Sequence, residues 1–228
     1  MFRTFVCVTG AVLAAVVALT GCGPVRLGAA AIVGDQRISA ADLTDQVDNL
    51  ETAYRASNGA IQLQFPQSQL PQQVLGWMLR FQIGEQLAAR NHITVTRGET
   101  QRALARITSQ AQQQGGGTSK VKLADLAVAN GLPPDLLPEL GRYQAIQNAV
   151  IRQLDGGTLP TSQSALQQLS QALGRRQCLA AKSLHITINP QYGRMDYSRI
   201  AVIPAALTLS APESGPSPQP SARLTPAC

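Results

Sequence analysis

One stretch of the sequence, from Val74 to Leu87, limits the folds that this chain can adopt. Pro71 is suited to the first turn of a helix, and the residues after it place apolar side chains on nearly every side of that helix. These are Val74, Leu75, Trp77, Met78, Leu79, Phe81, Ile83 and Leu87. A helix that is apolar all round is normally buried. The stretch therefore predicts a mainly helical domain with this helix at its centre. Gly76 and Gly84, eight residues apart, would let another helix approach it closely.

Other segments have the spacing and the end signals of helices that can surround the central one. Ser39 can cap a helix whose apolar residues recur at three- and four-residue spacing. Thr96 and Glu99 form a capping-box pattern before a helix with Leu104 and Ile107 on its inner side, and with Arg102 and Arg106 sharing its outer side. Gly131 and Ser162 mark a further helix end and a further start. We expect these helices over about 39–54, 96–113, 122–130, 136–154 and 162–182.

Two short strands are expected at the start of the folded region. Apolar residues in 30–33 are followed by Gly34 and Asp35 and then by Ile38, and Gly34 permits the positive φ of a tight hairpin turn. A two-stranded hairpin is not stable alone, so it needs a further strand or a helix against it. The alternating segment 184–188 predicts a strand near the end of the domain, with His185 in its middle.

The first residues predict the compartment. Residues 1–21 have Arg3 near the start and an apolar run over 5–19, which is typical of a signal peptide. The run ends in Leu-Thr-Gly-Cys, which resembles a bacterial lipobox and makes Cys22 the residue that is lipidated. The alternative is an ordinary signal peptide with a chance cysteine. With lipidation, residues 22–28 form a tether, and the protein is anchored to the cell membrane on its extracytoplasmic side.

The C-terminal residues differ from the rest of the chain in composition. Residues 205–228 are rich in Pro, Ser and Ala and predict a disordered tail after a folded domain over 29–204. Besides Cys22, the mature chain would hold two cysteines, Cys178 and Cys228, in an oxidising compartment. They either form a disulfide or remain free or intermolecular thiols, since a helical cysteine is often simply buried.

The sequence has few residues of the types that carry out catalysis or bind metal ions. The chain has two histidines, His92 and His185, and no H-E-x-x-H, C-x-x-C or G-x-S-x-G pattern. The formal net charge is +6, but the arginines are scattered, whereas a nucleic-acid-binding surface concentrates them in one patch. We therefore expect a protein that is not an enzyme, with no catalytic residue, metal or cofactor, and no nucleic-acid partner.

Two segments resemble a known family. Ala89 and residues 93–99 match the pattern that ends the long helix of SurA-type periplasmic folding factors, with His92 where the family has Gly. Residues 188–196 resemble a strand found near the end of lipoproteins of this group, with Gln191 and Met195 as departures. The resemblance covers about 29–196. It is to the SurA N-terminal chaperone domain, whose outline PrsA foldases and the trigger-factor C-terminal domain share.

This resemblance implies that the last strand returns to pair with the hairpin and that the helices form a cradle for unfolded or exported polypeptides. Family members often carry a parvulin prolyl-isomerase domain before the last helix, but between Leu154 and Ser162 there is room only for a loop. The resemblance thus implies a lipoprotein form that lacks the isomerase domain.

We expect a membrane-tethered, non-enzymatic folding factor for exported proteins. A groove between the helices before and after the Gly115–Gly117 joint would hold the client, with Trp77, Met78 and Phe81 as candidate lining residues, although core packing also accounts for Trp77 and Met78. The alternative is an envelope scaffold or assembly subunit with one fixed protein partner. A third hypothesis is a solute-binding lipoprotein. Such proteins usually need two lobes of alternating strands and helices, and this sequence shows no such alternation.

Overall fold

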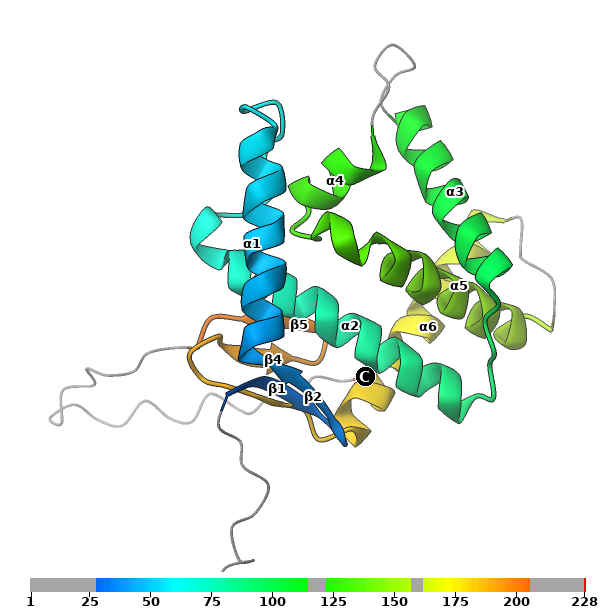
Figure 1. The fold of residues 1–228 in the computed structure, drawn as a ribbon. Coiled ribbons are helices and arrows are strands. Elements are labelled where there is room, and N and C mark those ends of the chain that lie inside the picture. Colours follow the sequence, from blue (N-terminus) through cyan, green and yellow to red (C-terminus); the bar gives the residue numbers. More distant parts are fainter. Residues whose placement is uncertain (1–27, 115–121, 157–161, 206–227) are drawn as a thin grey trace, which may run out of the picture.

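The computed structural model describes residues 28–114, 122–156, 162–205 and 228. The predicted signal peptide, the joint at Gly115–Gly117 and nearly all of the tether and tail lie outside the described residues. The described part is mainly helical with small antiparallel sheets (Figure 1), which confirms the predicted fold class. The helices are α1 (Ala40–Ala56), α2 (Leu70–Arg90), α3 (Arg97–Gln114), α4 (Leu123–Ala129), α5 (Leu137–Leu154) and α6 (Gln163–Ser183). The strands are β1 (Ala29–Val33), β2 (Gln36–Ser39), β3 (Thr187–Ile188), β4 (Arg194–Asp196) and β5 (Ala201–Ile203). Short 3-10 turns precede α2 and α5, at Gln67–Gln69 and Pro134–Leu136.

Local side-chain signals start three of the helices as predicted. The Ser39 hydroxyl accepts a hydrogen bond from the Asp42 amide at 2.9 Å and caps α1. At the start of α3, the Thr96 amide donates to Glu99 Oε2 at 2.8 Å, and the Glu99 amide donates to Thr96 Oγ1 at 3.2 Å. Ser162 caps α6 in the same way as Ser39 caps α1. These bonds satisfy amides that a helix start leaves without partners.

The hairpin forms around Gly34, whose φ is +56°. β1 lies in the middle of a three-stranded sheet in the order β2-β1-β3, so a strand from the C-terminal part of the domain returns to the hairpin as the resemblance implied. This strand is β3, and the two strands after it form a separate sheet. β3 is shorter than predicted. His185 lies outside it with a φ of +49°, because α6 continues to Ser183 and the Leu184 carbonyl accepts from the Gly34 amide at 2.7 Å.

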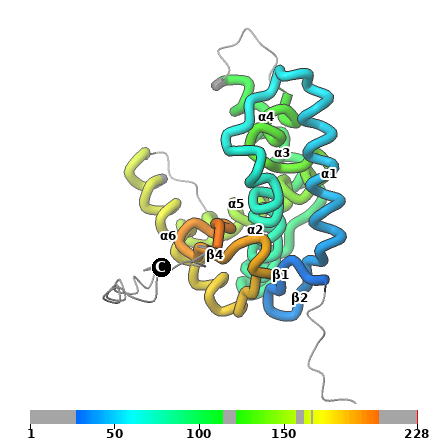
Figure 2. The backbone as a smooth tube through the Cα atoms, turned by 90° about the vertical axis from the view of Figure 1, so that its left-hand side faces the viewer, coloured from blue at the N-terminus to red at the C-terminus, as the bar shows by residue number. Residues whose placement is uncertain are grey.

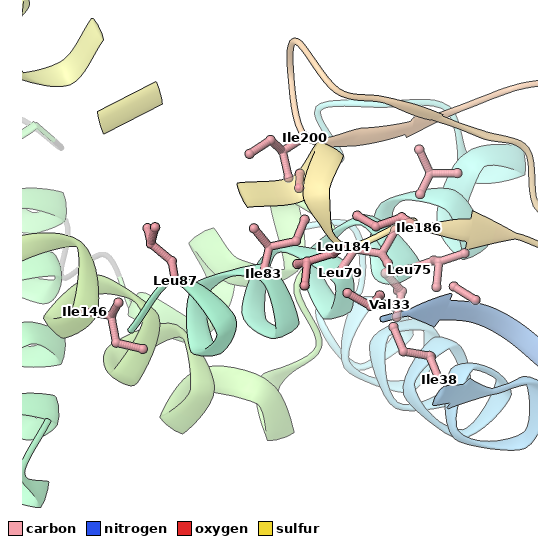
Figure 3. Close-up of a cluster of buried hydrophobic side chains, with 14 of the residues drawn as sticks. Val33, Ile38, Leu75, Leu79, Ile83, Leu87, Ile146, Leu184, Ile186 and Ile200 are labelled. Carbon is pink, nitrogen blue, oxygen red and sulfur yellow. The ribbon is translucent and has the colours of Figure 1, made fainter. Parts of the chain in front are cut away.

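α2 runs through the core. Val74, Leu75 and Leu79 are fully buried, and Figure 3 shows Leu75, Leu79, Ile83 and Leu87 along the helix between Val33 of the hairpin and Ile146 of α5. The prediction that α2 is buried on every side is wrong, however. Trp77, Met78 and Phe81 are only half-buried, and Trp77 borders a cavity.

The two glycines of α2 have different neighbours. A Cβ atom on Gly84 would lie 2.7 Å from Cδ2 of Tyr143, so the predicted close approach of a helix is confirmed there, with α5 as the neighbour. At Gly76 the prediction is wrong, since the nearest atom is the Val202 amide nitrogen of β5, 3.8 Å from such a Cβ. The sequence did not predict the β4–β5 hairpin, whose strands have three residues each.

α1 and α6 pack against α2 from opposite sides (Figure 2). On α6, Cys178 forms a disulfide with Cys228, and their Cα atoms are 5.6 Å apart. The bond joins Cys228 to the helical domain.

Candidate functional site

An apolar cavity of about 430 Å³ lies between α2, α3, α4 and α5. Its volume is in the range of ligand-binding pockets, roughly 300–1,000 Å³. Three polar side chains, Gln110, Asn130 and Gln144, border it. The large apolar residues of its lining are Trp77, Ile107, Leu123, Leu126, Leu132 and Leu140.

Two contacts hold the walls of this cavity in place. α3 and α5 cross closely at Gly141, where a Cβ would lie only 2.5 Å from Leu104 Cγ. The end of α4 is fixed to α2 because the Trp77 indole N–H donates to the Asn130 carbonyl at 3.0 Å. The next residue, Gly131, has a φ of +74°, which suits a glycine at a helix end.

Most of the large lining residues do not take part in the main core. Among the described residues, Trp77, Ile107, Leu123, Leu126 and Leu140 are absent from the buried cluster around α2 and from the side chains packed against it. The fold therefore places a second apolar group beside its core and leaves space in front of it.

Trp77 is the one predicted groove residue that lines the cavity. Its ring centroid is 5.9 Å from that of Phe81, which in turn lies 5.8 Å from the Tyr143 ring. Phe81 is thus in an aromatic row beside the cavity, and Met78 packs against the core. The Arg80 guanidinium lies 4.8 Å from the centre of the Trp77 ring and donates to the Ile200 carbonyl.

Burial changes the pKa values of Arg80 and Tyr143. It lowers the pKa of Arg80 from its ordinary value and raises the pKa of the Tyr143 phenol. Tyr143 therefore stays neutral, and its hydroxyl accepts a hydrogen bond from Gln177 Nε2 at 3.2 Å.

The lining residues from α3, α4 and α5 were not predicted as a set. Ile107 was expected to point inward, and Leu123 and Leu126 lie three residues apart on a short helix. That spacing is the signal of an apolar face, but it does not reveal whether the face packs against a neighbour or borders a cavity.

A second, polar cavity of about 170 Å³ lies beside α3 and α5. Its lining includes Arg102 and Arg106 of α3, Asn148 and Arg152 of α5, and Glu99. Glu99 Oε1 is 3.7 Å from Arg152 Nη2. The pKa of Glu99 is below its ordinary value, first because the Thr96 amide and hydroxyl donate to the carboxylate, and then because Arg152 and Arg102 are near.

Among the described residues, few features indicate metal binding, histidine chemistry or a membrane span. These residues contain no group of three or more His, Cys, Asp or Glu residues that could hold a metal ion. His92 and His185 are both exposed, and each has a positive φ, near 50°. No described helix is both long enough and apolar enough to cross a membrane.

The protein is of the mainly helical class. Its domain is closed by a hairpin and a returning strand, and it has an apolar cavity among its helices. The model of the SurA-like N-terminal domain family matches residues 3–151, and the chain belongs to this family. The family is associated with chaperone-type periplasmic folding factors. The match includes every residue of the apolar cavity. No curated protein and no solved structure matches the chain.

Proposed function

We propose that this protein is a non-enzymatic, membrane-anchored folding factor that binds unfolded segments of exported proteins in the apolar cavity between α2 and α5. The observation that carries the proposal is the group of apolar side chains that line this cavity and take no part in the main core. Apolar side chains that border a cavity and stay partly exposed form the kind of surface that marks an interaction site. Membership of the SurA-like family supports the same function.

The cavity suits weak and unselective binding. Burying one large apolar side chain contributes about 1.5–3 kcal/mol, and this contribution does not depend on direction. The polar side chains at the rim, Gln110, Asn130 and Gln144, are amides that can donate to and accept from a peptide backbone. An extended segment with one or two apolar residues would therefore bind without a fixed sequence.

Anchoring through Cys22 completes the proposal. The pattern Leu-Thr-Gly-Cys after an apolar run supports lipidation at this residue. Among the described residues, the first one bonded to the folded domain is Gly28, whose carbonyl accepts from the Ala40 amide. Six residues of extended chain span at most about 20 Å. The tether would keep the cavity close to the membrane across which clients are exported.

The test is suppression of aggregation, measured by light scattering of a denatured client protein with and without the chain from Gly23 onward. The variant Leu126→Gln places a polar side chain in the cavity without touching the core cluster. The matched control is Leu179→Gln on α6, since Leu179 is 59% exposed and lies outside the cavity. We expect L126Q to lose most of the suppression and L179Q to keep it.

Other results would change the proposal. If L179Q loses activity and L126Q keeps it, the binding site is the surface of α6. If several-fold excess of the unaltered chain has no effect while a pull-down from cells gives one stoichiometric protein, the function is that of an envelope scaffold with a fixed partner. Faster proline isomerisation in a peptide assay would contradict the non-enzymatic proposal.

A further inference from the structure

The apolar and the polar cavity lie end to end along the seam between α3 and α5. On α5, the apolar cavity is lined by Leu140 and Gln144, and the polar cavity by residues one and two turns further on, Asn148 and Arg152. These four residues are spaced by four, so they form one ridge of the helix. Gln144 and Asn148 are joined by a side-chain hydrogen bond of 3.3 Å.

The facing side of α3 shows the same order in reverse, since the two helices run antiparallel. Gln110 borders the apolar cavity, whereas Arg102 and Arg106 border the polar one. These three residues are also spaced by four and line a shallow third hollow along α3. The seam therefore changes from apolar at one end to cationic at the other.

The cationic end has more positive than negative charge. Three arginines line the polar cavity, and among its lining residues Glu99 is the one carboxylate. That carboxylate already accepts hydrogen bonds from Thr96 and lies beside Arg152. Within the described residues, neither Arg102 nor Arg106 donates a hydrogen bond or forms an ion pair through its guanidinium. Arg102 is near the Glu99 carboxylate but forms no ion pair with it, so the N–H groups of both guanidinium groups can donate to an anion from outside.

We propose that the seam selects client segments in which acidic residues follow or precede an apolar residue by two to four positions. This inference rests on the proposed function and names the chemistry of its substrate. The apolar residue enters the cavity at Ile107 and Ala111, and the carboxylates meet Arg102 and Arg106. Measured from Ala111, Arg106 and Arg102 are five and nine residues away along α3, which is about 7–13 Å. An extended peptide covers that distance in about two to four residues.

The test compares three blocked peptides that share a Leu-Phe-Leu segment and differ three and four residues away, where they carry two glutamates, two glutamines or two lysines. Binding is measured by fluorescence anisotropy to the chain as matured by the cell, held in phosphatidylcholine nanodiscs. We expect the glutamate peptide to bind about three- to tenfold more tightly than the glutamine peptide at low salt. The difference should shrink in 0.5 M NaCl because salt screens exposed charges.

Two double variants locate the effect. R102Q/R106Q removes two positive charges of the seam and should abolish the preference for glutamate. R175Q/R194Q removes the same charge from exposed positions on α6 and β4, outside the lining of either cavity, and should keep the preference. The charge reversal R102E/R106E should make the lysine peptide the tightest of the three. Circular dichroism melting shows that each variant is folded.

Each outcome has a distinct meaning. Equal binding of all three peptides would overturn the charge selection but leave the proposed function standing. A glutamate preference that survives in R102Q/R106Q, or that disappears equally in R175Q/R194Q, would show an effect of net charge and overturn the assignment to the seam. No binding of any peptide would refute the proposed function itself.

Discussion

The contact between Gly84 of α2 and Tyr143 of α5 decides whether an alanine at position 84 stabilises or destabilises the protein. In the variant Gly84→Ala, the new methyl would lie 2.7 Å from Cδ2 and 3.1 Å from Cε2 of the Tyr143 ring. Carbon atoms in contact prefer about 3.5–4.0 Å, so the ring or a helix must move by roughly 1 Å. The ring is held by the edge contact with Phe81 and by the hydrogen bond from Gln177.

Two opposing contributions set the magnitude. Overpacking of this kind costs about 1–3 kcal/mol. Alanine in the interior of a helix is better than glycine by about 0.8–1 kcal/mol. We therefore expect G84A to lower the free energy of unfolding by up to about 2 kcal/mol. The control is Gly174→Ala in α6, where a Cβ would meet no atom within 4 Å. There the propensity gain acts alone, so G174A should stabilise the protein by up to about 1 kcal/mol.

The assay is urea unfolding of the chain from Gly23 onward, followed by circular dichroism at 222 nm, with the two variants and the unaltered chain at equal concentration. The two substitutions are chemically identical and both lie inside helices. If G84A stabilises the protein as much as G174A does, the close packing of α2 against α5 is wrong. The same result would remove the stated reason for a glycine at position 84.

Three further outcomes are expected. Cys22→Ala should move the protein from the membrane to the soluble fraction, and retention on membranes after a carbonate wash would contradict lipidation. Cys178 and Cys228 are 50 residues apart, so reducing the bond between them should lower the free energy of unfolding by up to about 4 kcal/mol, from the loop-closure entropy of the unfolded chain. Two thiols that react in the non-reduced, denatured chain would show that the bond is absent. Because folding lowers the pKa of Glu99, its contribution to stability is complete above its ordinary pKa of 4.5 and is lost as the pH falls below that value. Glu99→Gln should therefore lower the melting temperature at pH 7 and bring it closer to that of the unaltered chain near pH 3, and an equal loss at both values would refute this account.

Features set by residues close together in the chain could be predicted from the sequence. The helix starts at Ser39, Thr96 and Ser162 each depend on a side chain that bonds an amide three residues away. The hairpin turn depends on one glycine, Gly34, which adopts a positive φ. The mainly helical class and the central place of α2 could also be predicted. The side chains of a helix point in fixed directions, so apolar residues on most sides of α2 indicate that other elements surround it.

What the tertiary structure alone decided is how these elements meet. The prediction placed Trp77, Met78 and Phe81 in one groove because all three are large and lie on α2, yet only Trp77 lines the cavity. The other walls come from α3, α4 and α5, up to 67 residues further along the chain at Gln144. An apolar pattern states that a side chain avoids water. It does not state whether a neighbour fills the space in front of that side chain, and the packing of distant helices against one another settles that question.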